Sequence, residues 1–315
     1  MASGGLQGAR LTGPMAEPAA RSLAPSSDER PQVIYVMGAG RSGSTILGVT
    51  MGNYENVFYA GELDAWLARS GEPQVGDAAR VRFWSAVRDE VPGASELFGR
   101  TAERSLERSM SLLRIHRWRA RRRIRGPYRR IAQDLYRAVS RTAGTPLIVD
   151  TSHYPLRARE LQELDGIDLY LVYLMRDPQS VVASFNRKDV AQFTKSTLTT
   201  NVYLWLTNLL CVWVFLRSPR DRRIVVRHED FVADPEGVVR DILRCVGVTA
   251  APPDFSALET GLAFQGNRVI RSERTALRSE PDRPAQRSAI TTVLQLPWAA
   301  LLSRLRPVAS NSARD

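Results

Sequence analysis

Apolar residues along the chain gather into short continuous runs, and longer segments of helical periodicity separate these runs. The clearest runs lie at residues 33–37, 147–149, 169–174 and 224–226. Short runs rich in β-branched and aromatic residues, without alternation, are typical of strands buried on both faces. Helical patterns occupy residues 45–51, 79–90, 128–141, 178–185, 198–216 and 235–246. This alternation predicts an α/β fold in which a mostly parallel sheet carries helices on both faces.

Two parts of the chain depart from this alternation. Residues 1–30 are rich in Ala, Ser, Gly and Pro without any period, which predicts a disordered tail before one domain at residues 31–315. Residues 202–216 are strongly apolar, but the run is shorter than the about 20 residues of a membrane span. It also contains Thr207 and Asn208, so we expect a buried core helix.

The composition of the chain bears on the cellular compartment in which the protein works. The first 30 residues lack the apolar segment of a secretory signal. The chain has two cysteines, Cys211 and Cys245, too few for a disulfide framework. These observations favour a reducing, cytoplasmic location.

The formal net charge of +11 favours anionic partners such as phosphorylated nucleotides, acidic polymers or anionic lipid. Residues 114–130 carry nine arginines and no acid. Two interpretations stay open for this segment. It is either a solvated helix face or, since Ile115, Trp118 and Ile124 interrupt the charges, an interfacial helix that holds the protein peripherally at an anionic membrane surface. We expect no nucleic-acid partner.

A glycine-rich loop at residues 38–45, GAGRSGST, lies between the first predicted strand and the first predicted helix. Free N–H groups and the helix dipole make this a favourable position for a phosphate. The loop nearly fits the nucleotide-triphosphatase pattern GxxxxGK[ST], but Ser44 stands where that pattern has lysine. Only Asp150 follows a strand as a metal-binding acid would, so magnesium-dependent ATP chemistry is disfavoured. Two functions stay open as alternatives for a chain with this loop. One is a P-loop small-molecule kinase, and the other is a noncatalytic protein that binds a polyanion or a membrane.

The run VIYVMGAGRSGST at residues 33–45 resembles the 5′-phosphosulfate loop of sulfotransferases that use 3′-phosphoadenosine 5′-phosphosulfate (PAPS), in their bacterial and carbohydrate branches. The resemblance implies a P-loop-like sulfotransferase fold, PAPS as co-substrate, no metal, and transfer of a sulfuryl group to a hydroxyl or amine. The acceptor is then a small molecule, a glycan or a lipid. The residues implied in binding the 5′-phosphosulfate are Gly40, Arg41, Ser42, Gly43, Ser44 and Thr45.

A second stretch, LVYLMRDPQSVVAS at residues 171–184, resembles the family's 3′-phosphate element and implies contacts from Arg176 and Ser184. An arginine at a strand end also offers a rigid two-pronged donor to a phosphate. The GNR run at residues 266–268 resembles a late GNP loop that closes over the nucleotide, which makes Asn267 and Arg268 candidate contacts. The combined resemblance covers residues 32–272.

Two residues are candidates for the general base. Glu62 lies in an AGEL context like that of the carbohydrate branches, and a partly buried carboxylate can have its pKa raised towards neutrality. His153 ends a VDTSH run that resembles the family's VDSSK element, with histidine at or near the position of a lysine that reaches the bridging oxygen. Histidine needs little tuning to act as a base. Arg41 would stabilise the departing phosphate, and His116 and His228 are weaker candidates.

Overall fold

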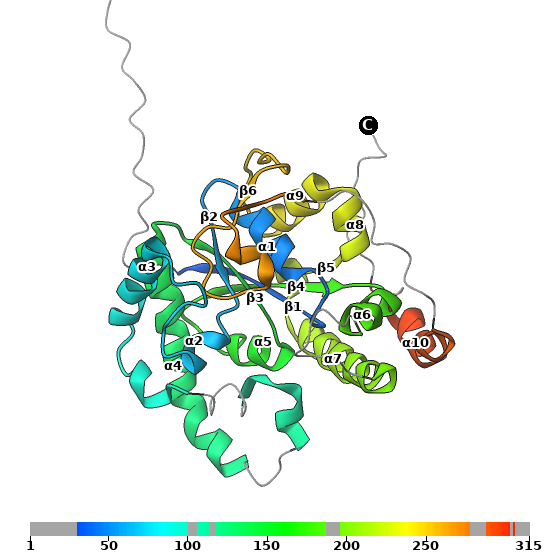
Figure 1. Cartoon of the computed structure of the whole chain (residues 1–315). Helices are drawn as coiled ribbons and strands as arrows, with labels where there is room; N and C mark the ends of the chain where they lie inside the picture. Colours follow the sequence, from blue (N-terminus) through cyan, green and yellow to red (C-terminus); the bar gives the residue numbers. More distant parts are fainter. Residues whose placement is uncertain are drawn as a thin grey trace, which may run out of the picture.

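Five parallel strands form one sheet in the computed structural model, in the order β2-β3-β1-β4-β5 (Figure 1). The structure describes residues 30–99, 106–113, 118–186, 196–277, 288–302 and 305. The strands are β1 (Gln32–Gly38), β2 (Val57–Gly61), β3 (Leu147–His153), β4 (Asp168–Met175) and β5 (Arg223–Arg227). Because β3 and β4 flank β1 on opposite sides, the strand order reverses at β1. In open sheets such a reversal leaves a crevice at the carboxyl ends of the strands.

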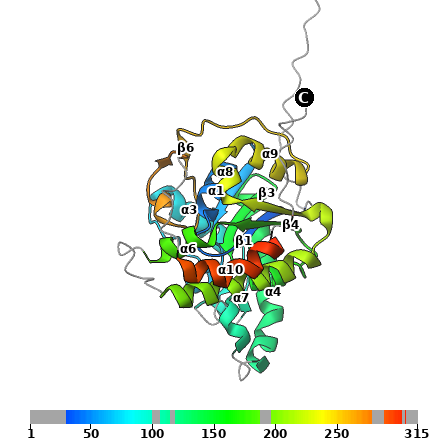
Figure 2. The ribbon, with the colours of Figure 1, turned by 90° about the vertical axis from the view of Figure 1, so that its right-hand side faces the viewer.

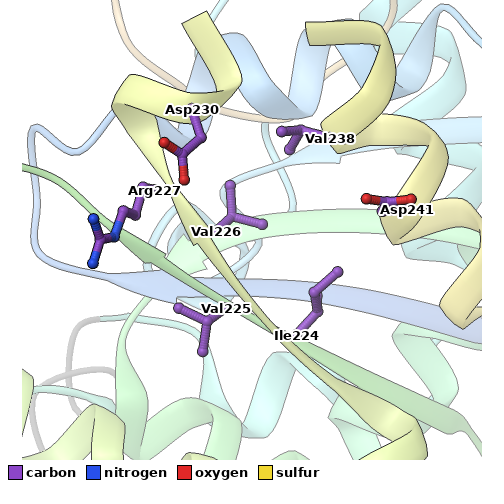
Figure 3. A pocket seen from close by; sticks show the side chains of 7 residues that line it. All are labelled: Ile224, Val225, Val226, Arg227, Asp230, Val238 and Asp241. Carbon is purple, nitrogen blue, oxygen red and sulfur yellow. The ribbon is translucent and has the colours of Figure 1, made fainter. Parts of the chain in front are cut away.

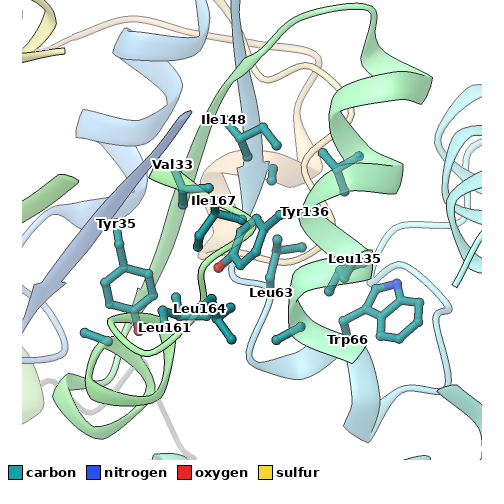
Figure 4. Close-up of a cluster of buried hydrophobic side chains, with 14 of the residues drawn as sticks. Val33, Tyr35, Leu63, Trp66, Leu135, Tyr136, Ile148, Leu161, Leu164 and Ile167 are labelled. Atoms are coloured by element: carbon teal, nitrogen blue, oxygen red, sulfur yellow. The ribbon is translucent and has the colours of Figure 1, made fainter. Parts of the chain in front are cut away.

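Helices cover both faces of the sheet. One face carries α2 (Ala65–Ala68), α3 (Ala78–Asp89), α4 (Trp118–Ala143), α5 (Pro155–Leu161) and α7 (Thr197–Arg217). The other face carries α1 (Ser44–Gly52), α8 (His228–Ala233) and α9 (Pro235–Cys245). Side chains of β1 alternate between the two cores, with Val33 and Tyr35 in the first (Figure 4) and Ile34 in the second.

The remaining elements lie around this central unit. Two helices, α6 (Pro178–Phe185) and α10 (Ala289–Leu302), pack beside α7 (Figure 2). Two short strands, β6 (Leu258–Glu259) and β7 (Arg274–Thr275), form an antiparallel pair. The 3-10 turns are η1 (Ala94–Leu97), η3 (Ser109–Leu113), η5 (Arg220–Arg222) and η6 (Arg268–Arg271).

The predicted fold class is confirmed, and all four predicted strands are present. Sequence reasoning missed β2 and α5, which are only five and seven residues long and so give little periodicity, and it also missed the 14-residue helix α10. The predicted disordered tail falls, except for Arg30, on residues outside the described part, as do residues 114–117 of the arginine-rich segment. The domain boundary at residue 31 therefore stays a prediction.

The apolar helix at residues 198–216 is confirmed as α7, but it is a core helix on one side only. Cys211 and Val214 are buried in the core that packs on the sheet, and Leu204 is buried against α6, whereas Leu198 and Leu209 on the opposite side are exposed. In the part of the chain that the structure describes, α7 is the helix long and apolar enough to cross a membrane, and half of its apolar window is buried.

Candidate active site

The glycine-rich loop connects β1 to α1 at the carboxyl edge of the sheet, where the strand order reverses. Gly43 precedes α1 with a φ of 89°, and no side chain caps the helix, so the first N–H groups of α1 are left for an anion. A Cβ on Gly43 would lie 2.5 Å from Nδ1 of His228, and one on Gly38 would lie 2.3 Å from the carbonyl oxygen of Leu174. At both positions a larger residue would collide with these neighbouring atoms, so glycine is required.

The middle of the loop is held by side chains from other elements. Gly40 donates its N–H to the Tyr203 hydroxyl of α7 at 2.8 Å. Arg41 adopts a left-handed φ of 69°, and its carbonyl accepts a 2.7 Å hydrogen bond from Nη1 of Arg176. Ser42 is buried, and its hydroxyl has no hydrogen-bond partner among the described residues. Buried hydroxyls are normally paired, so this one is well suited to an oxygen of a bound ligand.

Arg176 joins the two elements that the sequence singled out for phosphate binding. It follows β4, which pairs with β1 so that Gly38 lies opposite Leu174, and this register brings Arg176 to the loop. A guanidinium has five N–H donors, so Arg176 is able to serve more than one acceptor, and a phosphate is well matched to its planar fork. Ser184 lies half-buried near the end of the short helix α6, which begins at Pro178.

The late loop at residues 265–268 lies next to the start of α1. A Cβ on Gly266 would be 3.4 Å from Cγ2 of Thr45 and 3.6 Å from the hydroxyl of Tyr59. Asn267 accepts a 2.7 Å hydrogen bond from the N–H of Arg268 and so caps η6, and both side chains are exposed. The third predicted element therefore borders the same site as the first two.

Glu62 follows β2 and is half-buried beside the same late loop. Its N–H donates to the carbonyl of Gln265 at 2.8 Å. Burial raises the pKa of the Glu62 carboxyl from its usual 4.5 to about 7; a hydrogen bond with Gln265 and the positive charge of Arg41 oppose that rise, and the negative charge of Asp150 adds to it. A group of this pKa exchanges a proton readily at neutral pH.

His153 is the last residue of β3 and pairs with Met37 of β1. Its backbone has a left-handed φ of 57°, and its ring lies 4.3 Å from that of Tyr154. Burial lowers the pKa of its imidazole to about 4, partly offset by a backbone hydrogen bond with Thr151, so the ring is neutral at pH 7 and able to accept a proton. Both candidate bases thus lie at the edge of the sheet that carries the loop.

A buried polar network supports the segment that carries Glu62. Asp150 accepts hydrogen bonds from the Tyr136 hydroxyl at 2.5 Å and from the N–H of Ser152 at 2.8 Å. The Ser152 hydroxyl in turn accepts the N–H of Asp64 at 2.9 Å, and Arg157 lies 3.5 Å from Asp150. The Asp150 carboxylate is thus occupied by internal partners. In the described ranges, no group of three or more His, Cys, Asp or Glu side chains could hold a metal ion.

Three site residues carried too little signal in the sequence to be assigned. His228 lies half-buried against Gly43, and burial together with Arg176 lowers the pKa of its imidazole to about 4. Its Nδ1 has no partner within the described residues, and its place directly after β5 was a usable clue. Tyr203 and Tyr59 reach the site from α7 and β2, and nothing in their local sequence indicates it.

The structure also contains a small cavity away from the loop. It lies between β5 and the helices α8 and α9, lined by residues that include Val226, Arg227 and Asp241 (Figure 3). Its volume of about 10 Å³ admits no more than one water molecule. This cavity is therefore too small for a nucleotide.

Residues 31–252 match the sequence model of the sulfotransferase family. No curated protein matches the chain. Among solved structures, the chain is similar to the sulfotransferase domain from the curacin biosynthetic pathway, with 16% identity, a TM-score of 0.50, and coverage of 85% of this chain and 98% of that one. The sulfotransferase domain of the Synechococcus PCC 7002 olefin synthase gives 19% identity, a TM-score of 0.50, and coverage of 88% and 97%. At these identities, the likeness to the two structures shows the fold.

Proposed function

Since the chain belongs to the sulfotransferase family, whose members are PAPS-dependent transferases, we propose that it moves the sulfuryl group of PAPS to a hydroxyl or amine of a small acceptor. The observation that carries this proposal is the hydrogen bond from Arg176 to the Arg41 carbonyl. It joins a strand-end arginine, which suits a 3′-phosphate, to a loop that suits a 5′-phosphosulfate. These two groups are the charged ends of one nucleotide.

The residues present fit such a nucleotide. The uncapped start of α1, with Ser44 and Thr45, offers N–H groups and hydroxyls to the 5′-phosphosulfate, and the unpaired hydroxyl of Ser42 gains a partner there. We assign the 3′-phosphate to Arg176 and Ser184. Asn267 and Arg268 are exposed on the loop beside Thr45, and we assign them to contacts with the bound nucleotide.

Transfer proceeds by direct displacement in this proposal. The acceptor oxygen or nitrogen forms a bond to sulfur while the bond between sulfur and the 5′-phosphate oxygen breaks, and the electron pair stays on that oxygen. Arg41 and the loop N–H groups stabilise the negative charge that develops there. The acceptor's proton passes to a protein base, so atoms and charge balance without a metal.

We assign the base to Glu62 in preference to His153. The raised pKa of Glu62, about 7, matches proton transfer at neutral pH better than the value of about 4 for His153. The influence of Arg41 on the Glu62 pKa also puts the carboxylate within electrostatic reach of the phosphosulfate loop.

Thermal unfolding with added nucleotide tests the proposal. A ligand that binds only the folded state raises the melting temperature. We expect adenosine 3′,5′-bisphosphate to do so in the presence of a metal chelator. Stabilisation by ATP with magnesium but not by the bisphosphate would instead indicate a kinase. A response to neither nucleotide, together with binding to a polyanion, would indicate a noncatalytic protein.

For location, we propose the cytoplasm. In support, both cysteines, Cys211 and Cys245, are free thiols, which suits a reducing compartment. Detecting the tagged protein in the periplasmic or secreted fraction of its cell would contradict this.

A further inference from the structure

A cavity of about 190 Å³ lies between α4, α5 and α7, and the proposed reaction makes no use of it. Four arginines line it with a single acid: Arg121, Arg125, Arg129, Arg159 and Glu160. Its remaining lining is apolar and includes Leu112 and Trp213. The cavity therefore combines an excess of positive charge with an apolar wall.

The acids of the described residues leave one of these arginines without a carboxylate partner. Glu160 accepts from Nε of Arg125 at 3.1 Å and from Nε of Arg129 at 2.8 Å, and Arg159 pairs with Glu163. Arg121 reaches only the carbonyl of Ser111, at 3.5 Å, and its Nε is buried without a partner in the part of the chain that the structure describes. An anion with several oxygen atoms would supply the missing acceptors.

The apolar wall continues into an exposed row on α7. Six residues, each three or four positions from the next, share one side of this helix and are each at least 37% exposed: Leu198, Val202, Trp205, Leu209, Trp213 and Leu216. At 1.5 Å per residue the row is roughly 27 Å long. An exposed apolar surface of this extent marks a contact with a partner or a membrane. Trp213 belongs to both features, so the row meets the arginine-lined cavity near its carboxyl-terminal end.

We propose that the cavity binds the phosphate of an anionic phospholipid in a bilayer, and that the α7 row enters the outer acyl region of the same leaflet. Charge complementarity selects this occupant, because four arginines and one acid line the cavity. Two further arginines lie beside tryptophan rings: Arg217 is 5.1 Å from the Trp213 ring, and Arg122 is 5.0 Å from the Trp118 ring. Tryptophan beside arginine suits the boundary between headgroups and acyl chains. A second copy of the chain would instead bring this positive surface against itself. The inference goes beyond the proposed reaction and does not depend on it.

Flotation with phosphatidylcholine vesicles, with and without phosphatidylglycerol, tests the proposal on the full chain. The wild-type protein is expected to float with the anionic vesicles, less so as salt is raised. Arg121→Gln should lower that binding about fivefold, because one arginine near an anionic surface contributes about that factor. Leu209→Ser should lower it as well, through the lost apolar contact.

Two matched controls lie away from this surface. Arg240→Gln changes an exposed arginine of α9, on the opposite face of the sheet, and Val81→Ser changes an exposed apolar residue of α3. Both should bind vesicles as the wild type does, and equal melting temperatures would show that all variants are folded. Unchanged binding by Arg121→Gln would overturn the proposal. So would binding of inorganic phosphate at Arg121 without vesicle binding, or loss of self-association rather than vesicle binding in Leu209→Ser.

Discussion

Replacing Glu62 with glutamine is expected to stabilise the fold at alkaline pH while removing most of the activity. The carboxyl has a pKa of about 7 in the folded chain, raised chiefly by burial from the usual 4.5. A raised pKa means that the fold favours the protonated acid. Its stabilising contribution is therefore fully present below pH 4.5 and is lost as the pH rises through 7.

The size of this effect follows from the two pKa values. At ~1.4 kcal/mol per pH unit, a rise of the pKa from 4.5 to about 7 corresponds to roughly 3.5 kcal/mol. Because Glu62 is only half-buried, we expect about 2 kcal/mol of that to appear at pH 8. Glutamine keeps the shape and carries no charge, so Glu62→Gln should be more stable than the wild type at pH 8 and nearly equal to it at pH 4.5.

Urea unfolding at both pH values measures this difference. Glu55→Gln is the control, since Glu55 is exposed and its replacement should change stability little at either pH. Turnover, followed as release of adenosine 3′,5′-bisphosphate from PAPS with a panel of hydroxyl and amine acceptors, should fall at least about 100-fold in Glu62→Gln. Lower stability of Glu62→Gln at pH 8, or a difference that does not depend on pH, would refute the reasoning. Turnover that survives in Glu62→Gln but collapses in His153→Ala would move the base to His153.

Three further outcomes are expected. Wild-type turnover should rise with pH through about 7, because the proposed base works when Glu62 is deprotonated, and a rate that falls over this range would contradict the assignment. Gly43→Ala should abolish nucleotide binding in calorimetry, since its Cβ would lie 2.5 Å from His228 at a φ of 89°; normal affinity would show that the loop can move aside. Tyr136→Phe should cost about 1–3 kcal/mol of stability by removing a buried 2.5 Å bond to Asp150, and no loss in urea unfolding would mean that this bond is not needed.

The parts of the fold that sequence could predict are those governed by local pattern. The run at residues 33–37 is a buried strand because its apolar residues are continuous, and the glycines after it are needed where Gly38 and Gly43 meet Leu174 and His228. Arg176 was predictable as a strand-end arginine, because a buried apolar run stops immediately before it. These features depend on neighbouring residues in the sequence.

The parts that sequence could not supply depend on contacts between distant segments. Tyr203 holds the loop from the middle of α7, and nothing near residue 203 indicates that role. The exposed side of α7 was likewise hidden, since apolar residues surround the helix and only the packing shows which half faces the sheet. His228 was named only as a weaker candidate base, because its contact with Gly43 depends on how α8 is placed against the loop.

The central claim is that one site binds both the 5′ and the 3′ phosphates of the nucleotide. Calorimetry with adenosine 3′,5′-bisphosphate and adenosine 5′-phosphate, in the presence of a chelator, tests it most directly. The bisphosphate should bind at least about tenfold more tightly, as expected for one added set of charged hydrogen bonds. Ser184→Ala should reduce that ratio, whereas Arg176→Ala should also weaken the monophosphate, because Arg176 holds the loop through the Arg41 carbonyl. Equal affinities of the wild-type protein for the two nucleotides would contradict the account.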